Sequence, residues 1–177
     1  PRLKLILLEE KTEVLLARLR RGQIDMALLA LPVAGDDLHS MALFDEPFCL
    51  AVSDRHPLAD RASVGAADLE QASLLLLDEG HCLRDQALEF CKNNAVDESR
   101  EFRATSLETL IQMVATDLGI TLVPEMATRE APRHLRFIPF RDPKPHRTIG
   151  LVWRRRASQH AFFEQIGGLM RRFRDAA

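Results

Sequence analysis

Short apolar runs alternate with helical patterns along this chain, and the alternation limits the possible folds more than any other feature of the sequence. The runs that predict strands span residues 3–8, 25–31, 38–44, 48–53, 74–77, 101–104, 120–123 and 148–153. The helical patterns span residues 13–21, 66–70, 83–93 and 158–174, with a further helix between Thr105 and Gly119. Strands and helices that alternate at this spacing predict an α/β fold with mostly parallel sheets.

Two of the predicted helices carry clear start and stop signals. Thr12 is expected to be the N-cap of the helix over residues 13–21, and Gly22 is expected to end it. The segment Thr105-Ser106-Leu107-Glu108 has the spacing of a capping box. We expect the helix that follows it to end at Gly119.

Charge and hydropathy point to a soluble, cytoplasmic protein. The 177 residues carry a formal net charge of −2, so the chain as a whole has no basic field for nucleic acid. The arginine-rich clusters at 154–156 and 171–174 are interpreted as solvated surface. The densest apolar run, residues 74–77, is far too short to cross a bilayer, and no signal-peptide pattern opens the chain. We therefore expect a cytoplasmic location and no membrane partner.

The chain contains three cysteines at irregular spacing. An odd number argues against a secreted disulfide framework and favours thiols that stay reduced until something oxidises them. The chain also begins at Pro1, without an initiator Met, and runs directly into an apolar segment. We therefore expect a piece of a longer protein, truncated on its N-terminal side.

Residues 80–91, GHCLRDQALEFC, place two of the cysteines on one predicted helix. At 100° per residue, Cys91 shares a face with Leu83, Ala87 and Phe90, whereas Cys82 lies half a turn away on the polar side. The sequence therefore predicts one packed thiol and one thiol near solvent.

Cys82 is predicted to lie at the N-terminus of that helix. The helix dipole and the unpaired backbone N–H groups there favour a thiolate, and His81 and Arg84 can add positive charge. A thiolate is the species that attacks a peroxide oxygen, so Cys82 has the surroundings of an oxidant sensor or a nucleophile. Taken singly, Cys82 could also be a cysteine that happens to begin a helix, and Cys91 could be ordinary core.

Taken as a pair, the two cysteines suggest a switch. Nine residues of helix separate their α-carbons by about 13 Å, whereas a disulfide tolerates at most about 7 Å. A Cys82–Cys91 bridge would therefore require the helix between them to unwind.

Other chemistry is not indicated. Cys49 lies in an apolar strand pattern and is interpreted as core. The sequence has no C-x₂-C or H-x₃-H spacing, and no G-x-S-x-G, P-loop or G-x-G-x-x-G motif. We therefore expect no metal site and no cofactor.

The cysteine segment resembles that of a known family. GHCLRDQ followed by Phe90-Cys91, together with residues 102–110, 119–124 and 147–152, closely resembles the regulatory domain of LysR-type transcriptional regulators, and among them the hydrogen-peroxide sensors. The resemblance covers nearly the whole chain, and the HCLRDQ-to-FC element is specific to the peroxide sensors.

The resemblance implies a fold and a division of roles. The fold is two α/β subdomains of periplasmic-binding-protein type, with subdomain I from residues 1–44 and 150–177 and subdomain II from 47–147. Cys82 would be the peroxidatic cysteine and Cys91 the resolving cysteine. The residues implied around the peroxide are Thr12, Gly80, His81, Leu83, Arg84 and Arg147.

The resemblance also implies partners. These are hydrogen peroxide, further copies of the chain in a dimer or tetramer, and cellular thiol reductants such as glutaredoxin or glutathione. DNA and RNA polymerase would be reached only through the full-length protein, because the family's winged helix-turn-helix DNA-binding domain lies outside this sequence.

Two other classes of function compete with this one. A thiol enzyme would need a site for its reductant, and the sequence offers no C-x-x-C pattern for it, so we expect the chain not to be an enzyme. An effector-binding domain would instead take a small organic anion in a hinged cleft, with the thiols incidental.

Overall fold

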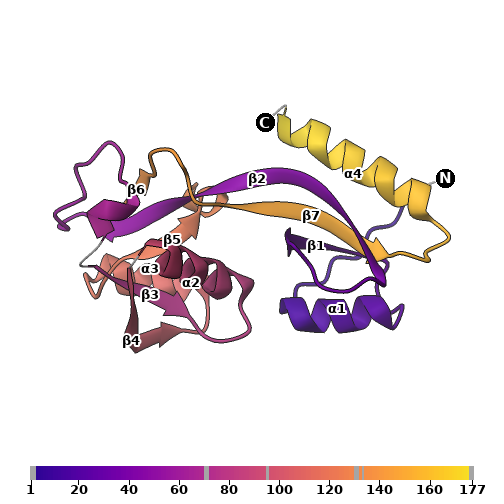
Figure 1. The fold of residues 1–177 in the computed structure, drawn as a ribbon, viewed down its shortest axis with the longest axis horizontal. Coiled ribbons are helices and arrows are strands. Elements are labelled where there is room, and N and C mark those ends of the chain that lie inside the picture. Colours follow the sequence, from indigo (N-terminus) through magenta and orange to yellow (C-terminus); the bar gives the residue numbers. More distant parts are fainter. Residues whose placement is uncertain (1–2, 70–71, 95, 130–131, 133, 176–177) are drawn as a thin grey trace. The chain divides into compact units, whose positions relative to one another are not determined.

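A computed structural model describes residues 3–69, 72–94, 96–129, 132 and 134–175. The chain forms two compact units, and each contains helices and strands, as the α/β prediction requires (Figure 1). Unit 1 consists of Pro1–Leu43 and Gly150–Ala177, and unit 2 consists of Phe44–Ile149. None of the described helices is both long and apolar enough to span a bilayer.

The helices and strands alternate along the chain as follows. In chain order they are α1 (Thr12–Arg20), β1 (Met26–Leu31), β2 (Leu38–Ser53), η1 (Ala66–Leu69), β3 (Ser73–Leu77), α2 (Cys82–Asn94), β4 (Asp97–Ala104), α3 (Leu107–Ala115), β5 (Thr121–Pro124), η2 (Glu125–Thr128), β6 (Leu135–Pro139), β7 (His146–Arg154) and α4 (His160–Asp175). η1 and η2 are single turns of 3₁₀ helix.

Unit 1 has a small core between α1 and its strands. The buried members of this core are Leu19, Ala27, Leu29, Leu38 and Val152. β1 pairs with β7, and β7 is the neighbour of β2 in the same sheet. Trp153 on β7 is fully buried and packs edge-on against Phe163 of α4. Through this contact, α4 packs against the sheet of unit 1.

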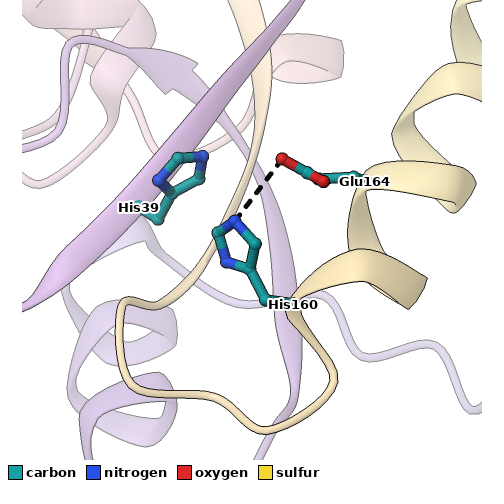
Figure 2. Close-up of side chains that lie close together, drawn as sticks. All are labelled: His39, His160 and Glu164. Atoms are coloured by element: carbon teal, nitrogen blue, oxygen red, sulfur yellow. Dashed lines mark ion pairs between the residues drawn. The ribbon is translucent and has the colours of Figure 1, made fainter.

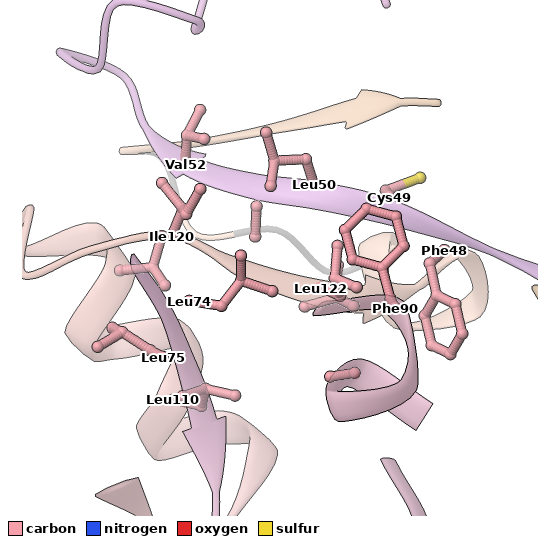
Figure 3. Close-up of a cluster of buried hydrophobic side chains, with 14 of the residues drawn as sticks. Phe48, Cys49, Leu50, Val52, Leu74, Leu75, Phe90, Leu110, Ile120 and Leu122 are labelled. Atoms are coloured by element: carbon pink, nitrogen blue, oxygen red, sulfur yellow. The ribbon is translucent and has the colours of Figure 1, made fainter. Parts of the chain in front are cut away.

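Unit 2 contains the larger core, which lies around β2 and β3 (Figure 3). Its fully buried side chains include Leu50, Val52, Leu74 and Leu122. Burial of a leucine-sized side chain contributes about 1.5–3 kcal/mol, so this cluster supplies most of the apolar stabilisation of unit 2.

The strand pairing in unit 2 differs from the predicted, mostly parallel arrangement. β2 pairs antiparallel with both β5 and β6, whereas β3 and β4 form a separate parallel pair. Strand direction is decided by which distant segments meet, and short apolar runs read alike in either direction. The parallel expectation therefore holds for β3 and β4 and is wrong for the pairs of β2 with β5 and β6.

The predicted strand over residues 3–8 is not formed. This segment has no regular secondary structure, and Leu5, Ile6 and Leu7 are exposed. A strand is stabilised by hydrogen bonds to a neighbour, and an extended apolar run without one gains nothing from its pattern. The pattern is apolar enough for a strand, but no strand within the described residues pairs with it.

Element boundaries account for the remaining corrections. The strands expected at 38–44 and 48–53 are one continuous strand, β2, and directly after Pro47 the backbone N–H of Phe48 binds the carbonyl of Pro145. Lys11, rather than Thr12, is the N-cap of α1. Ser106 is the N-cap of α3, and its hydroxyl accepts the Thr109 N–H at 3.1 Å.

Candidate functional site

The conformation of the turn before α2 allows the helix to begin at Cys82. β3 ends at Leu77, and Gly80 has a φ of +85°, a left-handed conformation that favours glycine. Arg84 then donates its backbone N–H to the carbonyl of His81 at 2.9 Å. Cys82 is the first residue of α2, and the backbone N–H groups of a first helical turn can face an anion.

The two thiols on α2 differ in burial as the sequence predicts. Cys91 is buried with Leu83, Ala87 and Phe90, whereas Cys82 is only partly buried. Neither cysteine is part of a disulfide, and the helix runs unbroken from Cys82 to Asn94. At 1.5 Å rise per residue their α-carbons are about 13 Å apart, so the helical form cannot contain the bridge.

The inner face of α2 is closely packed. The rings of Phe90 and Phe140 meet edge-on with centroids 5.4 Å apart. A void of only about 10 Å³ remains beneath the helix, which is at the lower limit for one water molecule. Its lining consists of Leu76, Leu77, Leu83, Arg84, Ala87, Leu110, Thr121 and Leu122. Because the two thiols are about nine residues apart along the helix, side-chain rotation alone cannot bring Cys91 to Cys82.

The C-terminal end of α2 is held by local hydrogen bonds. Asn94 donates its side-chain amide to the Phe90 carbonyl at 2.8 Å. The backbone N–H of Val96 binds the carbonyl of Cys91 at 3.1 Å. These bonds lie within a few residues of each other, so they can be lost without separating any strands.

Arg84 lies on the buried side of the helix. Its side chain is 8% exposed, and its guanidinium donates to the Leu77 carbonyl at 3.1 Å. The sequence suggests Arg84 as a cation beside Cys82. It does not indicate the hydrogen bond by which Arg84 also links α2 to the end of β3. A buried guanidinium of this kind must be hydrogen-bonded, because an unpaired buried charge is costly.

Arg147, the second predicted cation, forms an ion pair. Its guanidinium binds Glu46 at 2.7 Å, and Glu46 is 1% exposed. The other carboxylate oxygen of Glu46 accepts the Met126 backbone N–H at 3.2 Å. Glu46 was not predicted as a site residue, because it lies between the two strands expected at 38–44 and 48–53.

The remaining predicted site residues are distributed over both units. Gly80, His81 and Leu83 surround the start of α2 in unit 2. Thr12 is the first residue of α1 and belongs to unit 1. Its approach to Cys82 stays a prediction, as do the roles of the other residues around the peroxide.

Cys49 has a different environment from the pair on α2. It lies on β2 and is 7% exposed, as predicted for a core residue. Burial raises the pKa of the Cys49 thiol above its ordinary value, and the nearby charge of Glu125 raises it further. Cys49 is therefore held as a neutral thiol.

A groove of about 470 Å³ runs beside α2. α2 contributes Gln86, Glu89, Phe90, Asn93 and Asn94 to it, and residues 140–146 form the facing wall. Neither thiol lines this groove. The groove would lose one wall if α2 unwound.

Comparison with known proteins gives consistent matches over almost the whole chain. The family model described as LysR substrate binding domain matches residues 1–176. The DNA-binding transcriptional dual regulator OxyR of Escherichia coli K12 is 44% identical over 175 residues, which are 97% of this chain and 57% of that protein. The chain therefore spans a little over half the length of this relative.

Solved structures give the same result. The crystal structure of the oxidised form of OxyR is 44% identical, with a TM-score of 0.86 over 98% of this chain and 82% of that one. A hydrogen-peroxide-bound mutant of Corynebacterium glutamicum OxyR is 36% identical, also with a TM-score of 0.86, over 94% of this chain and 54% of that one.

Proposed function

Because the chain belongs to the LysR substrate binding domain family, we propose that it is the redox-sensing regulatory domain of a peroxide-responsive transcriptional regulator. The observation that carries the proposal is the placement of the two thiols on α2. Cys82 is partly accessible at the first residue of the helix, and Cys91 is buried nine residues later on the same helix. The names of the relatives, which are regulators of transcription or of peroxide-inducible genes, support the same proposal.

The first step is oxidation of Cys82. Its thiolate sulfur attacks one oxygen of hydrogen peroxide, the O–O bond breaks, and hydroxide leaves and is protonated to water. Sulfur is oxidised to a sulfenic acid, and peroxide is reduced. The position of Cys82 at the helix N-terminus favours the anion that this step needs. We propose that Thr12, Gly80, His81, Leu83, Arg84 and Arg147 shape the space that peroxide enters.

The second step is formation of the disulfide. The Cys91 sulfur attacks the sulfenic sulfur, an S–S bond forms, and the hydroxyl leaves as water with the proton of Cys91. The step requires α2 to unwind, because its helical form keeps the thiols too far apart. Unwinding forfeits hydrogen bonds and the packing of Phe90, at a cost on the order of several kcal/mol that the disulfide must offset.

The refolded segment would transmit the signal through packing between copies of the chain. In the full-length protein, a dimer or tetramer would reposition its DNA-binding domains and so change activation by RNA polymerase. The cycle would be reset in the cytoplasm by thiol reductants such as glutaredoxin or glutathione. A bridge that costs helix packing is easier to reduce than a structural disulfide, which suits such a reset.

A peroxide titration with thiol counting tests the function. One equivalent of peroxide should remove two thiols per chain and then stop, because the chain consumes peroxide stoichiometrically. Continuous consumption in the presence of excess reductant at an enzyme's rate would contradict the proposal and favour a peroxidase. Retention of all thiols would favour a domain that binds an organic anion.

A Cys49→Ser variant is the matched control for this titration. It also has one cysteine fewer than the natural chain, but it keeps both thiols of α2. It should still lose two thiols per chain. Loss of only one thiol from this variant would mean that Cys49 takes part in the bridge, and the assignment of the pair would fail.

A further inference from the structure

Two histidines and a glutamate of unit 1 meet outside the proposed thiol chemistry (Figure 2). His39 lies on β2, and His160 and Glu164 lie one helical turn apart on α4. One ring nitrogen from each histidine and one carboxylate oxygen all lie within 4.8 Å of one another. Side chains four residues apart on a helix lie on the same face, so His160 and Glu164 both lie on the side of α4 that is near His39.

The separations are close to those of a zinc site. The Nε2 atom of His160 is 3.4 Å from a carboxylate oxygen of Glu164. A tetrahedral zinc ion with bonds of 2.0–2.1 Å keeps neighbouring ligand atoms about 3.3 Å apart. His160 and Glu164 are already at this separation. His39 would need to approach by at most about 1.5 Å, which a side-chain rotation can supply.

The chemistry of the three groups also fits. Two imidazoles and one carboxylate are a donor set that zinc uses in proteins, with a fourth position open to water. A neutral imidazole offers the lone pair that a metal ion needs. The side chains of His160 and Glu164 are 39% and 53% exposed, so an ion can reach them from solvent.

Two features oppose a cation at this point. Arg155 places a positive charge near His39, although its guanidinium is held by the carbonyls of Asp36 and Leu38. Trp153 is fully buried and donates its indole N–H to Nδ1 of His160 at 2.9 Å. This bond requires the neutral ring of His160 to carry its proton on Nε2, the atom that a metal would need.

Binding therefore requires a change of tautomer in His160. The proton on Nε2 leaves to solvent, a proton from solvent binds Nδ1, and the ring stays neutral with its lone pair facing the ion. The indole N–H of Trp153 then loses its acceptor. An unsatisfied buried N–H weakens binding by roughly tenfold or more, but it does not outweigh three zinc ligands.

From these contacts we propose that His39, His160 and Glu164 form a binding site for a divalent zinc-type metal ion, in competition with the hydrogen bond from Trp153. A bound ion would join β2 to the first turn of α4. No sequence pattern indicates the site, since His39 and His160 are far apart in the chain and only the H-x-x-x-E spacing on α4 is local. The proposal does not depend on the thiol chemistry.

The test is a zinc titration of the Cys82→Ser/Cys91→Ser variant, in which the two α2 thiols cannot compete for the metal. Trp153 is the single tryptophan of the chain, so its fluorescence reports the loss of its hydrogen bond. We expect saturable binding of one zinc ion per chain, a change in emission and a higher melting temperature. Magnesium, which prefers oxygen ligands, should produce none of these effects. Absence of saturable zinc binding would overturn the proposal.

Three variants identify the ligands, with binding measured by calorimetry. His39→Gln and Glu164→Gln should each weaken binding at least tenfold, whereas His134→Gln, which changes an exposed histidine of unit 2, should not alter it. Unchanged affinity in the first two variants would overturn the proposal.

The Trp153→Phe variant tests the competition. It removes the competing donor and should bind zinc roughly tenfold more tightly if it remains folded by circular dichroism. Weaker zinc binding by the folded variant would show that the Trp153 indole favours zinc binding, and the proposed competition between its hydrogen bond and the ion would be wrong. If the variant unfolds, the two ligand variants, which change partly exposed side chains, still decide the site.

Discussion

Cys49 and Cys91 are equally buried in the same unit, but the backbone that holds each of them is different. Cys49 is 7% exposed and Cys91 is 5% exposed. Cys49 lies on β2, opposite Val123 of β5 on one side and Pro139 of β6 on the other. Cys91 lies on a helix whose backbone bonds close within its own turns.

Under the proposed mechanism, burial alone does not determine whether a thiol can react. Moving Cys49 would open two strand ladders that join distant parts of the chain, whereas moving Cys91 requires only a few local turns to unwind. Burial and the charge of Glu125 raise the pKa of the Cys49 thiol and hold it in the protonated form. The proposed switch therefore uses the cysteine on the helix, and we expect Cys49 on β2 to take no part in it.

The largest effect is expected from Cys82→Ser. This substitution removes the thiol at the start of α2, so the rate of thiol loss under peroxide should fall by at least about 100-fold. Stopped-flow mixing followed by thiol quantification measures the rate. The Cys49→Ser variant should stay within about twofold of the unmodified chain. If the rate of thiol loss fell equally in the two variants, the proposed difference between the helical thiols and the thiol on β2 would be wrong.

Cys91→Ser should separate the two oxidation steps. Cys82 should still react, but without a partner it should stop as a sulfenic acid or continue to a sulfinic acid. Intact-mass spectra should show one or two added oxygen atoms on Cys82 and no disulfide. A mass spectrum with unmodified Cys82 after peroxide treatment would contradict these roles.

Hydrogen exchange should reveal the contrast without a mutation. On disulfide formation, amides across residues 84–92 should exchange at least about tenfold faster, because their helical bonds are lost. Amides across residues 49–53 of β2 should not change. Unaltered protection of residues 84–92 in a fully disulfide-bonded sample would rule out unwinding of α2.

The smallest effect concerns pH. The folded pKa of Cys49 lies above the ordinary value of 9.0, so the unfolded chain loses this proton first as pH rises. The contribution of the protonated Cys49 thiol to the free energy of unfolding is complete below about pH 9 and is lost as the pH rises above that value. Urea unfolding of Cys49→Ala should show a shallower decline above about pH 9, by less than about 1 kcal/mol. An identical decline would mean that Cys49 is not a buried neutral thiol.

Local features of the site could be predicted from the sequence, and long-range features could not. The helix over α2, its buried face and the exposure of Cys82 follow from a periodicity that lies within 13 residues. The ion pair of Glu46 and Arg147 joins positions 101 residues apart, and no local pattern indicates it. The antiparallel partners of β2 were missed for the same reason. In residues 3–8 the pattern is apolar, but a strand also needs a neighbour.

The division into units falls inside two strands, between Leu43 and Phe44 in β2 and between Ile149 and Gly150 in β7. In terms of the gene, unit 2 is therefore one uninterrupted cassette of codons, and unit 1 is encoded by two pieces on either side of it. β2 and β7 are neighbours in the sheet, so the two points where the chain passes between the units lie on adjacent strands. Unit 2 has the layout of a domain insertion, and exchanging codons 44–149 between homologous genes would transplant both α2 cysteines as one heritable block.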